Sequence, residues 1–458
     1  MPGLTGIMYM AQQSLDATQG ALDVTTNNIS NASTPGYSRE QAILSEATPT
    51  EEGNLTYGNG VVLEQVQSIR DQMLELRISE ETQQQSSAQA QYNALQQVQA
   101  LFSDPTQGLG ADLTSFFNSI NQLSTDPTSV PQRQAVLTAA QNLASDFHQT
   151  ESNLDTIQSG LNQSVGQQVS QINSLTQQIA QLNGQVGEMQ KLGQDPGVLL
   201  DQENQLIDQL SQLTDVNVIQ TEQGFAITTA GGAALVTGNQ NFALQTSAVN
   251  GMTHVLSQGQ DITGNFQGGE LGGTLQVRDQ VIPGLLNTID TFANQFATAM
   301  NNAQGQGFDL NGNAGQPLFS FTAGPGAASS LGVAISDPNL IAASSDGTPG
   351  SNGNIANLMA VQTQALPAGA DPTDTYANLV SLTGNLTSQA QSEVNASTVS
   401  LNQLNDQLGS ISGVSIDEET TNLLSYQRAY EAAARIVTTV DELTQSVLQM
   451  GASAPTAP

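Results

Sequence analysis

Few residues of this chain could bind a metal or take part in acid-base or nucleophilic chemistry. The 458 residues include no cysteine and two histidines, His148 and His254, which lie far apart in segments of different type. Zinc sites need clustered histidine, cysteine and carboxylate ligands, and the HExxH motif of zinc peptidases is absent. His148 is better explained as a residue on a helix surface. The sequence therefore predicts no metal, no cofactor and no thiol chemistry.

The segment FDLNGNAGQP at residues 308–317 has the alternation of a calcium-binding loop. Asp309, Asn311 and Asn313 stand where such a loop has its first three ligands. The sixth position, which needs glycine, is Ala314, and the twelfth, which needs a bidentate glutamate, is Ser320. We therefore expect a polar turn here and no calcium site.

Three consecutive acidic residues, Asp417, Glu418 and Glu419, could in principle supply a catalytic carboxylate pair. They have no basic or nucleophilic residue beside them, and the start of a helix explains them, because the helix dipole favours negative charge there. No nucleophile elbow, Walker loop or dinucleotide fingerprint occurs in its required context. The sequence thus predicts that the protein is not an enzyme.

Arg428 and Arg435 are two of only eight basic residues in the chain. They are seven residues apart, so a helix presents both on one face. We expect them to form ion pairs with carboxylates of a neighbouring molecule. The alternative is a pair of solvated arginines, because exposed ion pairs contribute little to stability.

The arginines belong to a predicted helix that ends the chain. Its apolar and small residues recur at alternating spacings of three and four, which indicates a coiled-coil seam. The seam consists of Leu423, Tyr426, Tyr430, Ala433, Val437, Val440, Thr444 and Val447. Ser415 and Glu418 have the spacing of a capping box, which marks the start of the helix.

A second seam opens the chain within residues 4–30. It consists of Leu4, Met8, Ala11, Leu15, Thr18, Leu22, Thr25 and Ile29. The simplest arrangement lays the two terminal helices side by side, with the rest of the chain as one long excursion between them. Because several seam positions are Ala or Thr, which bury little apolar surface, we expect the pair to be marginal until neighbouring molecules cover it.

Charge and hydropathy exclude several classes of partner. Forty-one acidic residues give a formal charge of −33, so binding to nucleic acid or to an anionic membrane surface is not expected as a main function. No run of about eighteen apolar residues occurs, which excludes an ordinary transmembrane helix. The start of the chain lacks the basic region of a cleavable signal peptide, since the first basic residue is Arg39.

The middle of the chain is predicted to be helical with a β insert. Residues 41–69 suggest a short hairpin closed at Gly58-Asn59-Gly60, and the segment from about 70 to 160 is helical with breaks at Asp104-Pro105 and at 126–131. A helix at 161–192, a turn at 193–197 and a returning arm at 198–213 follow. Residues 215–271 alternate as short strands do. Helix returns at 273–303, with a break or kink expected near Pro283-Gly284.

The segment NNISNASTPGYSR resembles the N-terminal signature of the bacterial flagellar rod, hook and hook-associated axial proteins. The ending SIDEETTNLLSYQRAYEAAARIVTTVDEL is similar to the C-terminal signature of the same family. The first signature contains a sharp turn formed by Asn31, Thr34, Pro35, Gly36 and Tyr37. Residues 272–312 resemble a mid-chain segment of the member that joins hook to filament.

The resemblance implies a fold that is mainly α with a β insert, elongated, with N- and C-terminal helices paired as a coiled coil. Three parts are expected. Residues 1–40 and 411–458 form the paired helices of an inner tube, residues 41–214, 272–303 and 353–410 form a helical rod domain, and residues 215–271 and 304–352 form a β-rich outer insert.

The function implied is that of a structural protein that polymerises at the hook–filament junction. Its implied partners are copies of itself, hook protein, a second junction protein, an export chaperone and the flagellar type III export apparatus. Its implied location is the extracellular flagellum, reached without a cleaved signal peptide. The alternatives are a hook or distal-rod protein, an enzyme whose site lies in the β insert, and a secreted coiled-coil effector.

Overall fold

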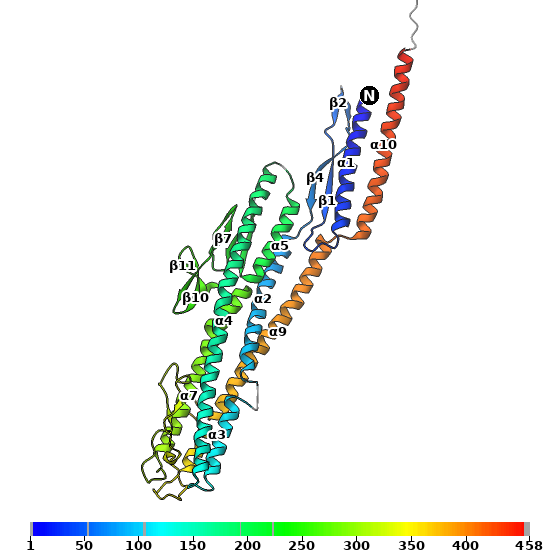
Figure 1. Cartoon of the computed structure of the whole chain (residues 1–458). Coiled ribbons are helices and arrows are strands. Elements are labelled where there is room, and N and C mark those ends of the chain that lie inside the picture. The colour runs from blue at the N-terminus through cyan, green and yellow to red at the C-terminus, as the bar shows by residue number, and fades with distance from the viewer. Residues whose placement is uncertain (1–2, 53–54, 104–106, 193, 222–223, 453–458) are drawn as a thin grey trace, which may run out of the picture.

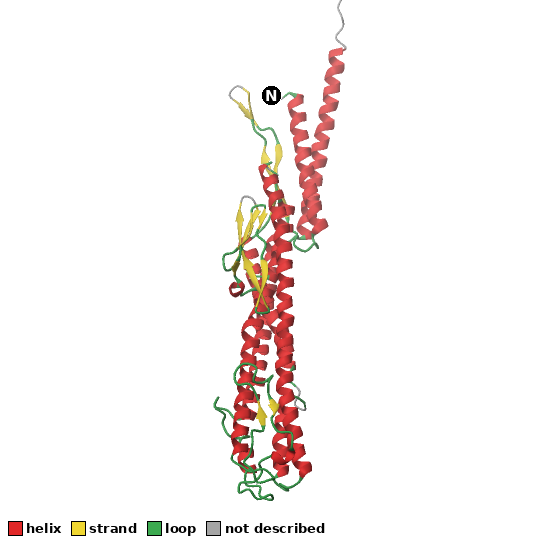
Figure 2. Ribbon diagram, turned by 60° about the vertical axis from the view of Figure 1, so that its left-hand side comes forward, coloured by secondary structure: helices red, strands yellow, loops and turns green. Residues whose placement is uncertain are grey.

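The computed structural model describes residues 3–52, 55–103, 107–192, 194–221 and 224–452. The molecule is long and narrow (Figure 1), with two terminal helices side by side at one end and a helical rod extending away from them. A view turned by 60° shows the same separation, with small sheets flanking the rod (Figure 2). The expected fold class is confirmed.

The terminal pair consists of α1 (Leu4–Asn31) and α10 (Ile416–Ala452), which pack against each other and run antiparallel (Figure 1). The acidic triplet occupies the first turn of α10, and the Ser415 hydroxyl accepts a hydrogen bond from the Glu418 N–H at 3.5 Å. Both features stabilise a helix start, because they satisfy free amides and oppose the positive end of the dipole.

A β-ribbon lies against α1. Strand β1 (Glu40–Glu46) pairs antiparallel with β4 (Val61–Ser68), and β2 (Thr50–Glu52) pairs with β3 (Leu55–Tyr57). The expected closure at Gly58-Asn59-Gly60 is wrong, because Glu52 already pairs with Leu55 and the chain has reversed before Gly58. The Asn59 amide instead donates to Thr48 O and Thr50 Oγ1, both at 2.6 Å, and so fixes the base of the ribbon.

The rod is built from helices, the longest of which run along its axis (Figure 1). They are α2 (Gln72–Ala100), α3 (Leu109–Leu123), α4 (Val130–Lys191), α5 (Gly197–Leu213), α6 (Gly269–Gln276), α7 (Ile282–Gly305), α8 (Ile355–Ala360) and α9 (Pro372–Ser412). Helix α2 packs along α9, α3 packs on α4, and α5 returns along α4. The expected helical hairpin at 193–197 therefore joins α4 to α5.

Helix α4 is one helix of 62 residues, although the sequence pattern suggested a helix to about 160 and a second one at 161–192. Pro131 sits in its first turn and no proline follows, so nothing breaks the backbone where the apolar pattern changes. The pattern changes because the partners of α4 change, from α3 and α7 to α5 and the β insert. The predicted break at 126–131 separates α3 from α4. The predicted break at Asp104-Pro105 lies outside the described residues.

The segment between α6 and α7 is a π-helical turn, Val277–Val281. It ends just before Pro283, which lies in the first turn of α7. Proline has no N–H to donate and crowds the preceding turn, so wider hydrogen bonding just ahead of it relieves the helix. The helical run predicted for 273–303 thus continues through the expected break near Pro283.

The β insert packs on α4 and forms two small antiparallel sheets, ordered β5-β6-β7-β8 and β11-β10-β9. Their strands are β5 (Val216–Thr221), β6 (Gly224–Thr229), β7 (Ala234–Thr237), β8 (Gln240–Asn241), β9 (Gln245–Val249), β10 (Met252–Ser257) and β11 (Gln260–Asp261). Near the far end of the rod, β12 (Phe319–Ser320) pairs with β13 (Gly332–Val333). Short 3-10 turns occur at Thr263–Asn265 and Pro338–Leu340.

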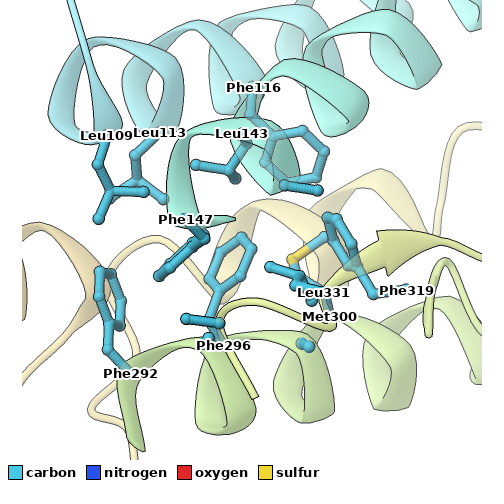
Figure 3. Packing of buried hydrophobic residues seen from close by; sticks show 14 of the residues in the cluster. Leu109, Leu113, Phe116, Leu143, Phe147, Phe292, Phe296, Met300, Phe319 and Leu331 are labelled. Carbon is cyan, nitrogen blue, oxygen red and sulfur yellow. The ribbon is translucent and has the colours of Figure 1, made fainter. Parts of the chain in front are cut away.

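The main hydrophobic core fills the end of the rod farthest from the terminal helices. Phe296 lies among other phenylalanine rings, with centroids 6.0 Å from Phe116 and 5.7 Å from Phe319 (Figure 3). The first pair is edge to face and the second is tilted, and aromatic pairs of this kind contribute more than their buried area alone. A second cluster joins α4 and α5 to the β insert. The rod therefore has cores of its own.

Candidate functional site

The surface that could carry a function is the pair of terminal helices with the turn and ribbon beside it. On α1, the predicted seam residues Ala11, Thr18 and Thr25 are buried, and Met8 is 42% exposed. The remaining seam residues Leu4, Leu15, Leu22 and Ile29 are partly buried. The seam on α1 is thus mostly closed by residues with small side chains.

The seam on α10 is more open. Ala433 and Val440 are buried. Leu423, Tyr426 and Val437 are partly buried. Tyr430 and Val447 are 37% and 52% exposed. Beyond the seam, α10 exposes large apolar side chains at Leu424, Ile436, Leu443 and Leu448. This helix therefore presents apolar surface that no described part of the chain covers.

Helix α1 buries a second face that the seam pattern did not predict. Ala17, Ala21, Val24 and Asn28 are buried. A Cβ added to Gly20 would lie 2.6 Å from the Leu63 side chain of β4, so the ribbon approaches this helix closely. The small residues Ala17, Gly20 and Ala21 were the signal available in the sequence. Helix α1 is thus packed between α10 and the ribbon.

Asn28 is the polar residue on this face that sequence reasoning missed. Its amide donates to Glu40 O at 2.8 Å and accepts from Glu40 N at 2.9 Å, and it also accepts from the Tyr37 hydroxyl at 2.8 Å. Burial raises the pKa of Tyr37, and the nearby carboxylates of Glu40, Asp201 and Glu419 raise it further. The phenol therefore stays protonated and available as a donor. These bonds fix the start of β1 on the end of α1.

The family turn connects these elements. Asn31 donates to Asn27 Oδ1 at 2.8 Å, and the Thr34 hydroxyl donates to Asn31 Oδ1 at 3.2 Å. Pro35 O accepts from Gln205 Nε2 of α5 at 2.8 Å. Gly36 has a φ of +75°, a conformation that favours glycine. The turn thus reverses the chain after α1 and contacts the rod.

Arg39 joins the two ends of the chain to each other. Its guanidinium pairs with Glu419 at 2.7 Å and with Glu418 at 2.9 Å, and its backbone N–H donates to Ser412 O at 2.9 Å. The Glu419 side chain is 2% exposed, so this pair is shielded from solvent. The acidic triplet therefore serves the helix start and also holds Arg39.

A second ionic contact joins the turn to the rod. Asp201 of α5 accepts from the Ser38 hydroxyl at 2.8 Å and pairs with Arg70. Asp201 lines a pocket of about 330 Å³ formed by the turn, α2, α5, α9 and strands β5 and β6. Burial raises the pKa of Asp208 in this pocket to about 6. Among the residues that the structure describes, no group of three or more His, Cys, Asp or Glu could hold a metal ion.

The two histidines and the loop that resembles a calcium site form contacts with neighbouring groups of the chain. His148 is exposed on α4, and its Nδ1 lies 2.9 Å from Ser329 O. His254 Nδ1 lies 2.6 Å from an Asp261 carboxylate oxygen, across β10 and β11. Asp309 accepts from the backbone N–H groups of Asn311 and Asn313, each at 2.8 Å. Its carboxylate thus closes a turn.

Arg428 and Arg435 are both exposed on α10. Neither side chain forms an ion pair or hydrogen bond within the part of the chain that the structure describes. In the same part of the chain, every helix is too short or too polar to cross a bilayer.

Both ends of the chain match families of flagellar axial proteins. Residues 8–37 match the family described as flagella basal body rod protein. Residues 409–450 match the C-terminal family of the flagellar basal body rod FlgEFG proteins. These matches coincide with α1, the family turn and α10. Together with the elongated fold and paired ends, they define a flagellar axial protein, a structural component of the flagellum.

Comparison with relatives identifies the family of this chain within the flagellar axial proteins. Residues 95–319 match the family described as flagellar hook-associated protein FlgK helical domain. Flagellar hook-associated protein 1 of Bacillus subtilis strain 168 is 30% identical over 490 aligned positions, which cover 96% of this chain and 96% of that protein. The protein of the same name from Escherichia coli K12 is 26% identical and covers 98% of this chain and 100% of its own. The chain belongs to the flagellar hook-associated protein 1 family.

A solved structure has the same fold. The flagellar hook junction protein FlgK from Burkholderia pseudomallei superposes with a TM-score of 0.67 and 18% sequence identity. The match covers 73% of this chain and 100% of that chain.

Proposed function

We propose that this chain polymerises with copies of itself at the junction between hook and filament and connects the two. The single observation that carries the mechanism is the contrast on α10. Its seam packs on α1 through residues such as Ala433 and Val440, whereas Leu424, Ile436 and Leu443, which lie outside the seam, are 51%, 47% and 51% exposed. Exposed apolar side chains of this kind are stabilised when a neighbouring copy covers them.

The division of the chain into three parts belongs to this proposal. Residues 1–40 and 411–458 form the inner tube, and residues 41–214, 272–303 and 353–410 form the rod. Residues 215–271 and 304–352 form the outer insert. This division assigns almost all of the β-ribbon to the rod, although β1 and β4 pack on α1 of the inner tube.

A position at the hook–filament junction implies the partners of this chain. The neighbours on the two sides are the hook protein and a second junction protein. An export chaperone covers the apolar face of α10 before the chain passes through the flagellar type III apparatus to the outside of the cell. The chain acts without catalysis, and the β insert forms outer contacts.

Deletion of the gene tests the proposal. Cells without it are expected to build hooks but to release unattached flagellin, because the filament has nothing to join. A gene that lacks residues 416–452 should fail to restore attached filaments, whereas one that lacks the β insert, residues 216–261, should restore them. Normal attached filaments in the deletion strain would contradict the proposal.

A further inference from the structure

Among the exposed charges of the terminal pair, two sets of opposite sign repeat at the same spacing. Helix α1 contains two charged residues, Asp16 and Asp23, and both are exposed. Helix α10 exposes Arg428 and Arg435. Each set has a spacing of seven residues, which is two turns of helix and about 10 Å at 1.5 Å per residue. Acidic and basic charges therefore repeat at the same interval.

Both sets point away from the seam within the chain. Asp16 and Asp23 each follow a buried seam residue, Ala11 or Thr18, by five positions. Five residues turn the helix by about 140°, so the two aspartates lie on the opposite side from the seam.

The arginines have the mirror arrangement on the other helix. Arg428 and Arg435 each precede a buried seam residue, Ala433 or Val440, by five positions. They therefore face away from α1 by the same angle. Within one molecule, the aspartates of α1 and the arginines of α10 therefore cannot pair with each other. Within the residues that the structure describes, none of the four side chains forms an ion pair or a hydrogen bond.

We propose that Arg428 and Arg435 of one copy pair with Asp16 and Asp23 of the next copy in the polymer. This inference rests on the proposed self-assembly and names its contact surface. Because α1 and α10 run antiparallel when all copies point the same way, Arg428 pairs with Asp23 and Arg435 pairs with Asp16. Shifting the helices by two turns leaves one pair, so two ion pairs select one register between copies.

Other carboxylates fit this pattern less well. Glu431 lies between the two arginines on α10 and forms an ion pair with neither among the described contacts, so it reduces the positive charge of this face. The exposed glutamates of the ribbon, such as Glu46 and Glu64, lie on strands and do not repeat at the interval of a helix. The contact is heterologous, because different surfaces of the two copies meet, and it can therefore extend from copy to copy.

Cysteine cross-linking tests the register without background, because the natural chain has no cysteine. In assembled flagella, the double variant Asp23→Cys with Arg428→Cys should give a ladder of covalent oligomers on a denaturing gel after treatment with a short bis-maleimide reagent, whose length replaces that of the Asp and Arg side chains. Each copy then links to the next on both sides. The matched control is Asp16→Cys with Arg428→Cys, whose cysteines are displaced by a further two helical turns, about 10 Å along the axis. Its subunits should run as monomers on the same gel.

The proposal is overturned if attached filaments form but the two double variants give the same products. It is equally overturned if the first variant gives none. Either result leaves the junction function intact, which depends on the deletion strain.

Charge reversal provides a second test if the cysteine variants assemble poorly. Arg428→Asp with Arg435→Asp should weaken each contact roughly tenfold and lower the number of attached filaments. Adding Asp16→Arg and Asp23→Arg should restore it. Failure of the fourfold variant to recover, with the monomer folded by circular dichroism, would contradict the pairing.

Discussion

The far end of the rod and the terminal helix pair are both helical, but they are held together in different ways. Phe296 and Phe116 of the rod are fully buried, and each contacts several other rings. The terminal seam is closed by residues such as Ala11, Ala433 and Val440. A phenylalanine side chain buries about 150–250 Å², several times what alanine contributes. The rod therefore buries enough apolar surface to fold alone, whereas the terminal pair needs a neighbouring copy to cover it.

This difference indicates that the terminal helices, and not the rod, provide the surface for assembly. Ordering about sixty terminal residues costs on the order of 60–120 kcal/mol of backbone entropy, at roughly 1–2 kcal/mol per residue. A thin seam offsets little of that cost beyond what helical hydrogen bonds supply. The exposed apolar residues of α10 leave the remaining stabilisation to a neighbour.

Hydrogen exchange on dilute monomer tests the contrast directly. Amides of α3, α4 and α7 should be protected by free energies approaching that of global unfolding, on the order of 5–15 kcal/mol. Amides of α1 and α10 should open at a small fraction of this free energy. Assembled flagella should show protection in both regions. Equal protection of rod and terminal helices in the monomer would remove the basis of the comparison.

Phe296→Ala should damage the rod and spare the ends. Phe296 lies within 6.5 Å, centroid to centroid, of five other phenylalanine rings, and its loss leaves a cavity among them. The free energy of unfolding should fall by about 3–5 kcal/mol, measured by denaturant titration. The matched control is Val440→Ala in the terminal seam, which should leave the denaturant midpoint unchanged. A comparable loss for Val440→Ala would mean that the ends share the fold of the rod.

Glu203 is a destabilising residue within the otherwise stable rod. Its side chain is fully buried, and neither carboxylate oxygen has a hydrogen-bond partner, since the nearby Phe225 N–H donates to Asn183. Burial raises the pKa of Glu203 to about 7, only partly opposed by the Phe225 amide and Arg70. The folded state therefore holds the proton more tightly than the unfolded chain does.

The raised pKa of Glu203 makes the free energy of unfolding depend on pH. The destabilisation is absent below the unfolded pKa of 4.5, grows as the pH rises toward 7 and is constant above it. Glu203→Gln should match the natural chain at pH 4 and exceed its free energy of unfolding at pH 8 by up to about 3 kcal/mol. Denaturant titrations across this range measure it. A variant that is no more stable at pH 8 would show that the buried carboxyl is accommodated.

Arg39→Gln tests the ion pair that joins the two ends of the chain to each other. Glu419 would lose its charged partner while staying buried, which should weaken the start of α10 by about 1–2 kcal/mol. Hydrogen exchange should speed up near residues 416–425, with the rod unchanged. Arg77→Gln is the control, because Arg77 is exposed on α2 and forms no ion pair within the described chain. Identical exchange in both variants would show that Arg39 does not stabilise the start of α10.

Much of the fold could be predicted from the sequence, because its evidence is local. The spacing of Leu423, Ala433 and Val440 fixes a helix and its inner face, and Ser415 with the acidic triplet fixes where that helix starts. Turn residues at 126–131 separate two helices for equally local reasons. The two terminal signatures identified the class of protein. Such features depend on neighbours in the chain, so they can be read without a structure.

Tertiary structure alone decided what the faces meet. The second buried face of α1 follows from the ribbon that lies on it, and Asn28 is buried because Glu40 and Tyr37 complete its hydrogen bonds. The continuity of α4 depends on partners that change along its length. Arg39 meets Glu419 across 380 residues of sequence. Periodicity assigns a residue to a face of a helix, whereas the partner of that face is set by packing between segments that are far apart in the chain.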